Sequence, residues 1–249
     1  MSKFGRFLAA TAMAGAIATS AIAEKSFDYA FQGSLKSLDP YTLRETFTLG
    51  ILTNVYEGLI KRGPNLEILP GLATSWEVIE PTRWRFHLRK GVKFHNGNDF
   101  TAEDVVFSGE RVNSEGSDMK GRVPVDATFE IVDDYTVDVI LASPNPILHY
   151  EWELWSIIDK DWAEANGSVR VTSASDSAET PISLMANGTG PFKITEHTGG
   201  VSTKFEANEN WWNWDNREFN IDKVNFTSIS ADATRVAALL SGEMDMVYP

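Results

Sequence analysis

The 249-residue chain contains no cysteine. This absence excludes disulfide bonds, thiolate metal sites and a cysteine nucleophile, and it also excludes an anchor on a lipid-modified N-terminal cysteine. Positive charge is scarce as well, because 22 Lys and Arg residues stand against 35 Asp and Glu residues, for a formal net charge of −13. An acidic chain repels phosphate backbones, so nucleic acid is not expected as a partner.

Sequence motifs for catalysis and for metal binding are also lacking. The four histidines do not show the i, i+4 spacing of a helical metal site, and there is no H-E-x-x-H motif, Asp-rich calcium loop or G-x-S-x-G sequence. Glu151 and Glu153 are conceivable as a glycosidase pair, but residues two apart on a helix do not face each other. We therefore expect no enzyme activity, no metal and no cofactor.

The first 23 residues have the features of a secretory leader. Lys3 and Arg6 precede an apolar run at 7–17, and Ala21-Ile22-Ala23 is an A-x-A cleavage site. The run is too short to span a bilayer, and no other segment reaches about 20 apolar residues. The sequence predicts cleavage after Ala23 and a soluble mature protein in the periplasm. The full chain has 43% apolar residues, enough to bury a sizeable core.

The stretch 69–108 predicts a β-hairpin followed by a helix. Two strands, at 73–79 and 83–89, are separated by Glu80-Pro81-Thr82, where proline favours a turn. In the second strand apolar and basic side chains alternate, as in a half-buried antiparallel strand: Trp84, Phe86 and Leu88 against Arg83, Arg85, His87 and Arg89. The basic residues, with Lys90 and Lys93, are expected on the solvent face beside acidic partners. Thr101 and Asp104 resemble a capping box at the start of the helix.

The remaining patterns indicate an α/β protein. Strands are expected at 25–31, 129–132, 136–141, from 192 onward, and at 202–207, 224–229 and 244–247. Helices are expected at 48–59, 144–155 and 232–240, where apolar residues recur at helical spacing. The polar stretches 114–122 and 166–187 are expected to be a surface loop and a linker.

The hairpin stretch carries a family resemblance through the sequence W-E…W-x-F-x-L-R-K-G-V-K-F-H-x-G-x-x-F-T-A-E-D-V-V-F-S. Shorter matches are Leu-Asp-Pro at 38–40, Tyr-Glu-Gly-Leu at 56–59, Gly-Thr-Gly-Pro-Phe at 188–192, Trp-Trp at 211–212 and the unit at 235–247. The chain resembles the extracellular solute-binding proteins of the dipeptide/oligopeptide-binding family. These proteins are the capture components of bacterial ABC importers for peptides, nickel and related solutes.

The resemblance implies a periplasmic-binding-protein-like α/β fold of type II. Lobe one would be discontinuous, formed by 24–63 and 188–249, with an inserted α+β intermediate domain at 64–187. Because the resemblance covers only the first part of a family member, we expect the second ligand-gripping lobe to be missing from this sequence. We therefore expect the 249 residues alone to bind solute poorly.

The implied function is capture of a short peptide or related small molecule by a monomer that closes around it and docks on an ABC-type membrane permease. The sequence does not identify the ligand among peptides, opines, sugars and metal chelates. Two alternatives stay open at this point. One is a secreted glycoside hydrolase, and the other is a carbohydrate-binding module that uses Trp211, Trp212 and Trp214 as a stacking platform, although packing at the edge of the lobe is favoured for these residues.

The candidate ligand contacts come partly from position within the family pattern. Arg44, Glu45, Thr46 and Phe47 lie where family members place extended backbone against the ligand, and such backbone can add a peptide as a further strand. A surface loop is the alternative. Trp152 and Trp155 are candidates to line a cleft, with core packing as the alternative. Thr189 is the last candidate, between Gly188 and Gly190, which are predicted to form a hinge that needs glycine conformations.

Overall fold

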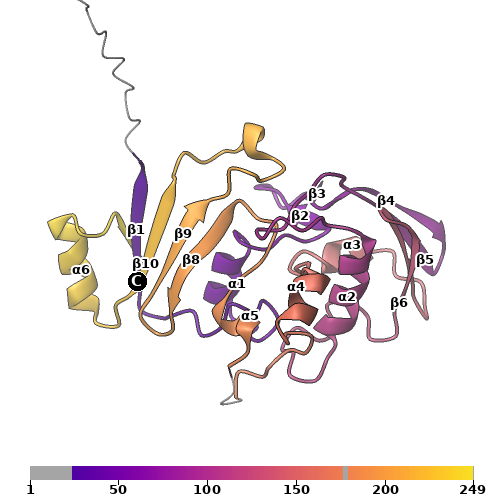
Figure 1. Cartoon of the computed structure of the whole chain (residues 1–249), viewed down its shortest axis with the longest axis horizontal. Helices are drawn as coiled ribbons and strands as arrows, with labels where there is room; N and C mark the ends of the chain where they lie inside the picture. The colour runs from indigo at the N-terminus through magenta and orange to yellow at the C-terminus, as the bar shows by residue number, and fades with distance from the viewer. Residues whose placement is uncertain (1–23, 176–178, 249) are drawn as a thin grey trace, which may run out of the picture.

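Figure 1 shows two β-sheets at opposite ends of the molecule, with most of the helices between them. The computed structural model describes residues 24–175 and 179–248. The leader and its predicted cleavage site after Ala23 lie outside the described residues. None of the helices in the described part of the chain is long and apolar enough to cross a membrane.

The five-stranded sheet has the order β11-β1-β10-β9-β8. Its strands are β1 (Ser26–Phe31), β8 (Phe192–Thr198), β9 (Ser202–Ala207), β10 (Lys223–Ser228) and β11 (Met246–Val247). β1 is parallel to both β10 and β11, whereas β8, β9 and β10 form antiparallel pairs. The sheet therefore joins the first described strand to strands about 200 residues later in the chain.

The four-stranded sheet has the order β4-β5-β7-β6 and is antiparallel throughout. Its strands are β4 (Ala73–Glu80), β5 (Arg83–Leu88), β6 (Thr128–Asp133) and β7 (Thr136–Ile140), and α2 (Ala102–Val112) runs beside it. A short ribbon of β2 (Ile60–Arg62) and β3 (Ile68–Pro70) leads into it. The domain boundaries expected at residues 63 and 187 remain predictions.

The hairpin and the capped helix predicted from the sequence are confirmed. Trp84, Phe86 and Leu88 are buried, while the basic residues between them face outward. Arg83 and Arg85 both contact Asp138, at 3.1 and 2.7 Å. The ion pairs also include Arg83 with Glu130 and Lys93 with Asp99. The basic residues are therefore paired with acidic partners, and the arginines cover the buried Asp138. At the start of α2, Thr101 and Asp104 form the expected capping box.

Several helices are shorter than the apolar spacing predicted. α1 (Thr46–Leu52) ends well before residue 59, and α3 (Leu148–Glu151) covers only part of 144–155. The expected linker at 166–187 contains the one-turn helix α5 (Pro181–Leu184), and α4 (Lys160–Ala165) was not predicted. In these regions the apolar residues are buried by tertiary packing instead of by helical periodicity, since Val55, Tyr56 and Leu59 lie in the core outside any helix.

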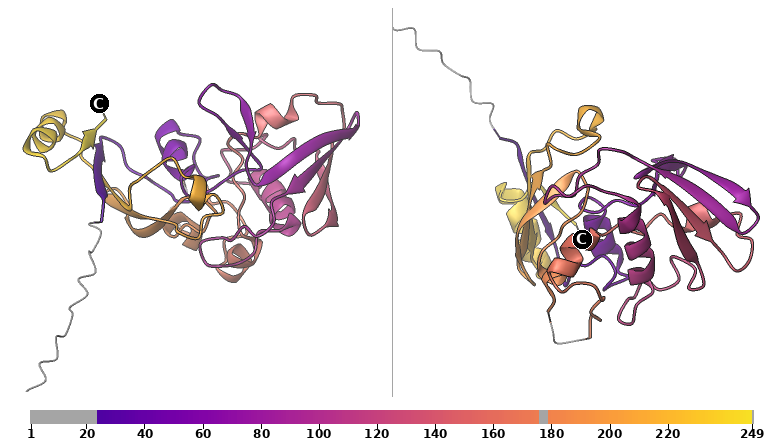
Figure 2. Two further views of the ribbon diagram at one scale, coloured as in Figure 1. Left: turned by 90° about the horizontal axis from the view of Figure 1, so that it is seen from above. Right: turned by 45° about the vertical axis from the view of Figure 1, so that its right-hand side comes forward.

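One continuous core links the two sheets. It includes Phe226 of the five-stranded sheet, Phe86 of the four-stranded sheet and the buried tyrosines Tyr41 and Tyr56. By contrast, α6 (Asp232–Ser241) lies at the far end of the molecule in Figure 1 and in the left view of Figure 2. It packs through a small separate cluster centred on Ala238.

Candidate functional site

The predicted ligand segment, Arg44 to Phe47, forms the entry to α1. Glu45 has extended backbone, and its carboxylate accepts hydrogen bonds from the backbone and the hydroxyl of Thr48, so it caps the helix. Phe47 packs on the rings of Phe31 and Phe226, at centroid distances of 4.3 and 5.3 Å. Arg44, Glu45 and Thr46 are all exposed, although one carboxylate oxygen of Glu45 is taken by Thr48. The side chains open to a ligand are therefore those of Arg44 and Thr46 and the remaining oxygen of Glu45.

The expectation of extended backbone throughout this segment is wrong for Thr46 and Phe47. Both residues belong to α1, because the carboxylate cap at Glu45 starts the helix there. Strand addition to a peptide is therefore restricted to the backbone before Thr46. The Thr46 N–H has no acceptor among residues 24–175 and 179–248, so it is free to donate to a bound molecule.

The structure places Trp152 and Trp155 in the core. Both are 0% exposed; their rings meet edge to face at 4.6 Å, and Trp152 stacks on Phe86 at 5.0 Å. The Trp155 indole N–H donates to the Ser108 carbonyl at 3.3 Å. In this structure, core packing describes both tryptophans, and neither presents surface to a cleft.

Thr189 is also fully buried, and its hydroxyl donates to the Glu57 carboxylate at 2.9 Å. Glu57 in addition accepts the indole N–H groups of Trp211 and Trp212, at 3.2 and 3.0 Å. Burial raises the pKa of Glu57, while these neutral donors act in the opposite direction. Arg89, next to the hairpin, lies over the Trp212 ring, at 3.8 Å from its centroid. This Glu57 cluster joins the segment after α1, the 188–190 segment and the tryptophan pair.

The two alternatives to solute capture gain no support from these positions. Trp211 and Trp212 are inclined at 59° and point their N–H groups at Glu57, so they do not form a flat stacking platform. Glu153 is paired with Arg62 at 2.7 Å, and Glu151 accepts a hydrogen bond from Asn145 at 2.7 Å. Each carboxylate is thus bound to its own partner. In the described part of the chain, no group of three or more His, Cys, Asp or Glu residues is arranged to hold a metal ion.

The predicted hinge at Gly188 and Gly190 needs correction. Neither glycine has a positive φ, so conformational freedom does not explain them. A Cβ at Gly188 would lie 2.0 Å from the Val55 carbonyl oxygen, and one at Gly190 would lie 2.6 Å from the Asn54 oxygen. The glycines are required because the segment after α1 passes directly against their backbone, where Gly190 N–H donates to the Val55 carbonyl at 2.9 Å. The contact is a close-packed junction.

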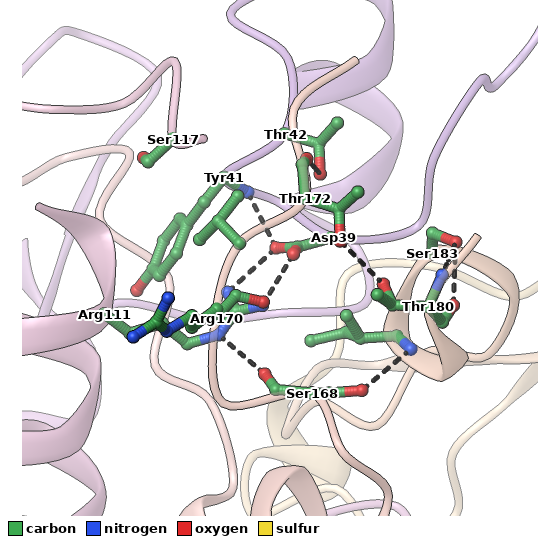
Figure 3. Close-up of polar contacts among 12 residues, drawn as sticks. Asp39, Tyr41, Thr42, Arg111, Ser117, Ser168, Arg170, Thr172, Thr180 and Ser183 are labelled. Atoms are coloured by element: carbon green, nitrogen blue, oxygen red, sulfur yellow. Dashed lines mark hydrogen bonds and ion pairs between the residues drawn. The ribbon is translucent and has the colours of Figure 1, made fainter. Parts of the chain in front are cut away.

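A buried ion pair that the sequence did not predict lies between the Leu-Asp-Pro loop and α2 (Figure 3). Arg111 of α2 binds Asp39 of the Leu-Asp-Pro motif through two hydrogen bonds, of 3.0 and 2.6 Å, and both side chains are about 1% exposed or less. Arg111 also donates to the Ser168 carbonyl at 3.0 Å, and Asp39 accepts from the Tyr41 N–H at 3.1 Å. The pair fixes the Leu-Asp-Pro loop to α2 and to the 168–170 segment. No local signal marks Arg111 as the partner, because 72 residues separate the two.

His95, in the turn that follows the β4–β5 hairpin, also contacts the 188–190 segment. Its Nε2 lies 3.0 Å from the Gly190 carbonyl, while its Nδ1 has no partner within the described residues. Burial lowers the pKa of His95 to about 4. In the unfolded chain this imidazole takes up a proton near pH 6.5, whereas in the folded chain it does so only near pH 4. This residue's contribution to stability is complete above about pH 6.5 and is lost as the pH falls through that interval.

We expect a His95→Gln variant to lose less stability between pH 7 and pH 5 than the parent protein, because glutamine can donate to Gly190 without titrating. Urea unfolding at both pH values measures the difference. Burial raises the pKa of Asp104 to about 6, which adds stability as the pH falls through the same interval, so only the comparison between variant and parent isolates His95. His87→Gln, on the exposed side of the hairpin, is the control. Equal pH dependence in the parent and His95→Gln would contradict the prediction.

Comparison with known proteins gives a consistent result. A family model described as "Bacterial extracellular solute-binding proteins, family 5 Middle" matches residues 67–249. The dipeptide-binding protein of Escherichia coli (strain K12) is 31% identical over 278 residues, covering 100% of this chain and 48% of the relative. The periplasmic oligopeptide-binding protein OppA of Salmonella typhimurium is 27% identical over 238 residues, covering 86% and 41%. The chain spans about half the length of these curated relatives, or less.

Solved structures show the same fold. The periplasmic binding protein DppA from Helicobacter pylori, in complex with the peptide STSA, matches with a TM-score of 0.75 and 27% identity, over 88% of this chain and 45% of that one. MoaA from A. tumefaciens R10, in complex with mannopinic acid, matches with a TM-score of 0.79 and 24% identity, over 91% and 45%. The described residues thus have the α/β fold found in about half of a periplasmic binding protein.

Proposed function

Because the chain belongs to the bacterial extracellular solute-binding proteins of family 5, we propose that it serves to capture a short peptide or a related small molecule outside the cytoplasm. The observation that carries this proposal is the family match over 67–249 together with the shared fold. The solute is then delivered to an ABC-type permease in the membrane. The protein acts as a monomer, after its leader is removed behind Ala23, and it does no chemistry on the solute.

The mechanism is closure around the solute. A ligand held between two lobes is removed from water on both sides, so its hydrogen bonds to the protein no longer compete with solvent. The parts described here are suited to supply one rigid side of such a clamp, because the core, the Glu57 cluster and the Asp39–Arg111 pair tie their segments together. Arg44 and Thr46 then meet the solute from this side.

A thermal-shift screen of the full-length protein tests the proposal. A bound ligand stabilises the folded state by about 2.7 kcal/mol at a hundred times its dissociation constant, so true ligands raise the melting temperature. We expect di- and tripeptides or related small molecules to give this shift and simple sugars to give none. A shift with glycans alone would contradict the proposal and would favour a carbohydrate-binding protein.

Thr46→Pro tests the ligand segment without disturbing the helix. Thr46 is the first residue of α1, a position that tolerates proline, and Glu45 already has the extended backbone that a following proline requires. The change removes the free N–H together with the side-chain hydroxyl, and relative to Thr46→Ala, which lacks the hydroxyl alone, ligand binding should weaken by about 0.5–1.5 kcal/mol in calorimetry. Thr46→Ala keeps the N–H and serves as the control. Unchanged affinity in a folded Thr46→Pro protein would place the contact elsewhere.

A further inference from the structure

The five residues at 38–42, shortly before the ligand segment, are all buried, and we call them the anchor segment. Its first half is tied to two other parts of the chain. The Leu38 N–H donates to the carbonyl of Ser183 in α5, at 3.0 Å. The Asp39 carboxylate is bound by the guanidinium group of Arg111 in α2. The entry to the anchor segment is therefore fixed by α5 and α2.

The second half of the anchor segment is fixed by three more hydrogen bonds. The Tyr41 hydroxyl donates to the Ser156 carbonyl, and the Tyr41 carbonyl accepts from the Asp118 N–H at 2.9 Å. The Thr42 hydroxyl donates to the Thr172 carbonyl at 3.1 Å, and Figure 3 shows these two residues side by side. Tyr41 is 0% and Thr42 only 5% exposed, so neither side chain is placed to touch a solute.

The two ends of the ligand segment are held by different parts of the chain. The partners of the anchor segment lie between residues 111 and 183, inside the range 64–187 that is predicted as the intermediate domain. At the other end, Glu45 caps α1, and Phe47 packs on rings from the ranges predicted for lobe one. The chain around the ligand segment therefore passes from one predicted domain to the other.

Only Leu43 and Arg44 lie between these two fixed ends. Within residues 24–175 and 179–248, neither of them forms a hydrogen bond or an ion pair. A stretch of two residues between fixed ends has few conformations to lose, so a solute can bind its backbone at little entropic cost. If the anchor end were released, more residues would have to be ordered when the solute binds, and the affinity would fall.

We propose that the predicted intermediate domain positions the ligand segment for solute binding, with Tyr41 and Thr42 as the positioning residues. The inference rests on the proposed function, and it gives the inserted residues a part in solute capture without any contact to the solute. The affinity then depends on hydrogen bonds buried behind the ligand segment, because they keep the binding-competent conformation populated before the solute arrives.

Thr42→Val in the full-length protein is the decisive variant, because it removes one buried hydroxyl and keeps the shape of the side chain. The matched control is Thr203→Val in β9. Thr203 is 1% exposed, and its hydroxyl is hydrogen-bonded to the His197 Nδ1 at 2.9 Å. Both changes should lower the midpoint of urea unfolding by similar amounts. The two variants thus make the same chemical change at different places.

The probe is the unblocked di- or tripeptide that raises the melting temperature of the full-length protein most. In calorimetry its dissociation constant should rise about fivefold or more in Thr42→Val, since ordering the backbone of one residue corresponds to a factor of this size. Thr203→Val should leave it unchanged. Tyr41→Phe, which removes the bond to Ser156, should weaken binding as well and tests the same end of the segment if Thr42→Val does not fold.

A coupling measurement distinguishes positioning from a general loss of structure. The loss of affinity caused by Thr46→Pro, relative to Thr46→Ala, should be smaller in a Thr42→Val background than in the parent, because a loosened segment holds the residue 46 N–H less well in place. The same loss should be unchanged in a Thr203→Val background.

The possible outcomes separate the inference from the function it rests on. Parent affinity in both Thr42→Val and Tyr41→Phe would overturn the inference and leave solute capture standing. Equal weakening in Thr42→Val and Thr203→Val would show that affinity simply follows stability, and this result would also overturn it. The inference fails too if Thr46→Pro binds as Thr46→Ala does in every background. No melting shift with any peptide would overturn the peptide ligand and the inference together.

Discussion

Replacing Arg111 with methionine should lower the free energy of unfolding by about 3–5 kcal/mol, because it leaves the Asp39 carboxylate buried without its cation. The Asp39 side chain is fully enclosed, and after the change the only donor left to its carboxylate among the described residues is the Tyr41 N–H. Water cannot replace the lost partner without opening the packing between the Leu-Asp-Pro loop and α2. Urea or guanidinium unfolding followed by circular dichroism measures the loss.

Two controls separate the buried charge from the loss of contacts in general. The double variant Asp39→Asn/Arg111→Met removes both charges and keeps an acceptor for Tyr41, so it should be more stable than Arg111→Met alone. Glu196→Gln breaks the exposed pair with Lys204, whose side chains are 55% and 51% exposed, and should cost less than about 1 kcal/mol. If Arg111→Met cost as little as Glu196→Gln, the buried pair would not fix the loop.

Gly188→Ala should be the other strongly destabilising change, costing about 3 kcal/mol or more. The new methyl carbon would stand 2.0 Å from the Val55 oxygen and 3.0 Å from the Tyr56 Cα, which are backbone atoms and cannot rotate away. To admit it, the chain must separate the segment after α1 from the 188–190 segment, and this movement breaks the hydrogen bond from Gly190 to Val55.

Gly50→Ala is the matched control for this change. Gly50 lies inside α1, and an added Cβ there meets nothing within 4 Å. Alanine in a helix interior should stabilise the protein by about 0.5–1 kcal/mol. The two Gly→Ala changes should therefore shift the unfolding midpoint in opposite directions. A Gly188→Ala protein as stable as its parent would show that the junction is loose enough to admit a side chain.

The features that the sequence predicted well are local. Alternation along Trp84, Phe86 and Leu88 and the capping pair of Thr101 and Asp104 each depend on residues a few positions apart, and the structure contains both. The family resemblance added the fold class, which the comparisons confirm.

The features that the sequence did not predict depend on distant partners. Asp39 meets Arg111 across 72 residues, and Glu57 meets Trp212 across 155. Apolar spacing likewise could not show that α1 stops at Leu52, because Val55 and Tyr56 are buried by the 188–190 segment and not by a continuing helix. The ligand segment at 44–47 was chosen by its position within the family pattern, and its contact with a ligand stays a prediction.

The parallel pairing of β1 with β10 and β11 has a consequence for the order of folding. Ser26 is aligned with Lys223, and Tyr29 with Met246, so the first strand finds its partners only after some 200 further residues have been made. Contacts this distant in sequence form slowly, because a long loop must close before they are gained. The β4–β5 hairpin and α2 can form early from neighbouring residues, whereas β1 stays an unpaired edge until β10 arrives. A chain interrupted before Lys223 would thus carry an open strand that invites pairing with other chains.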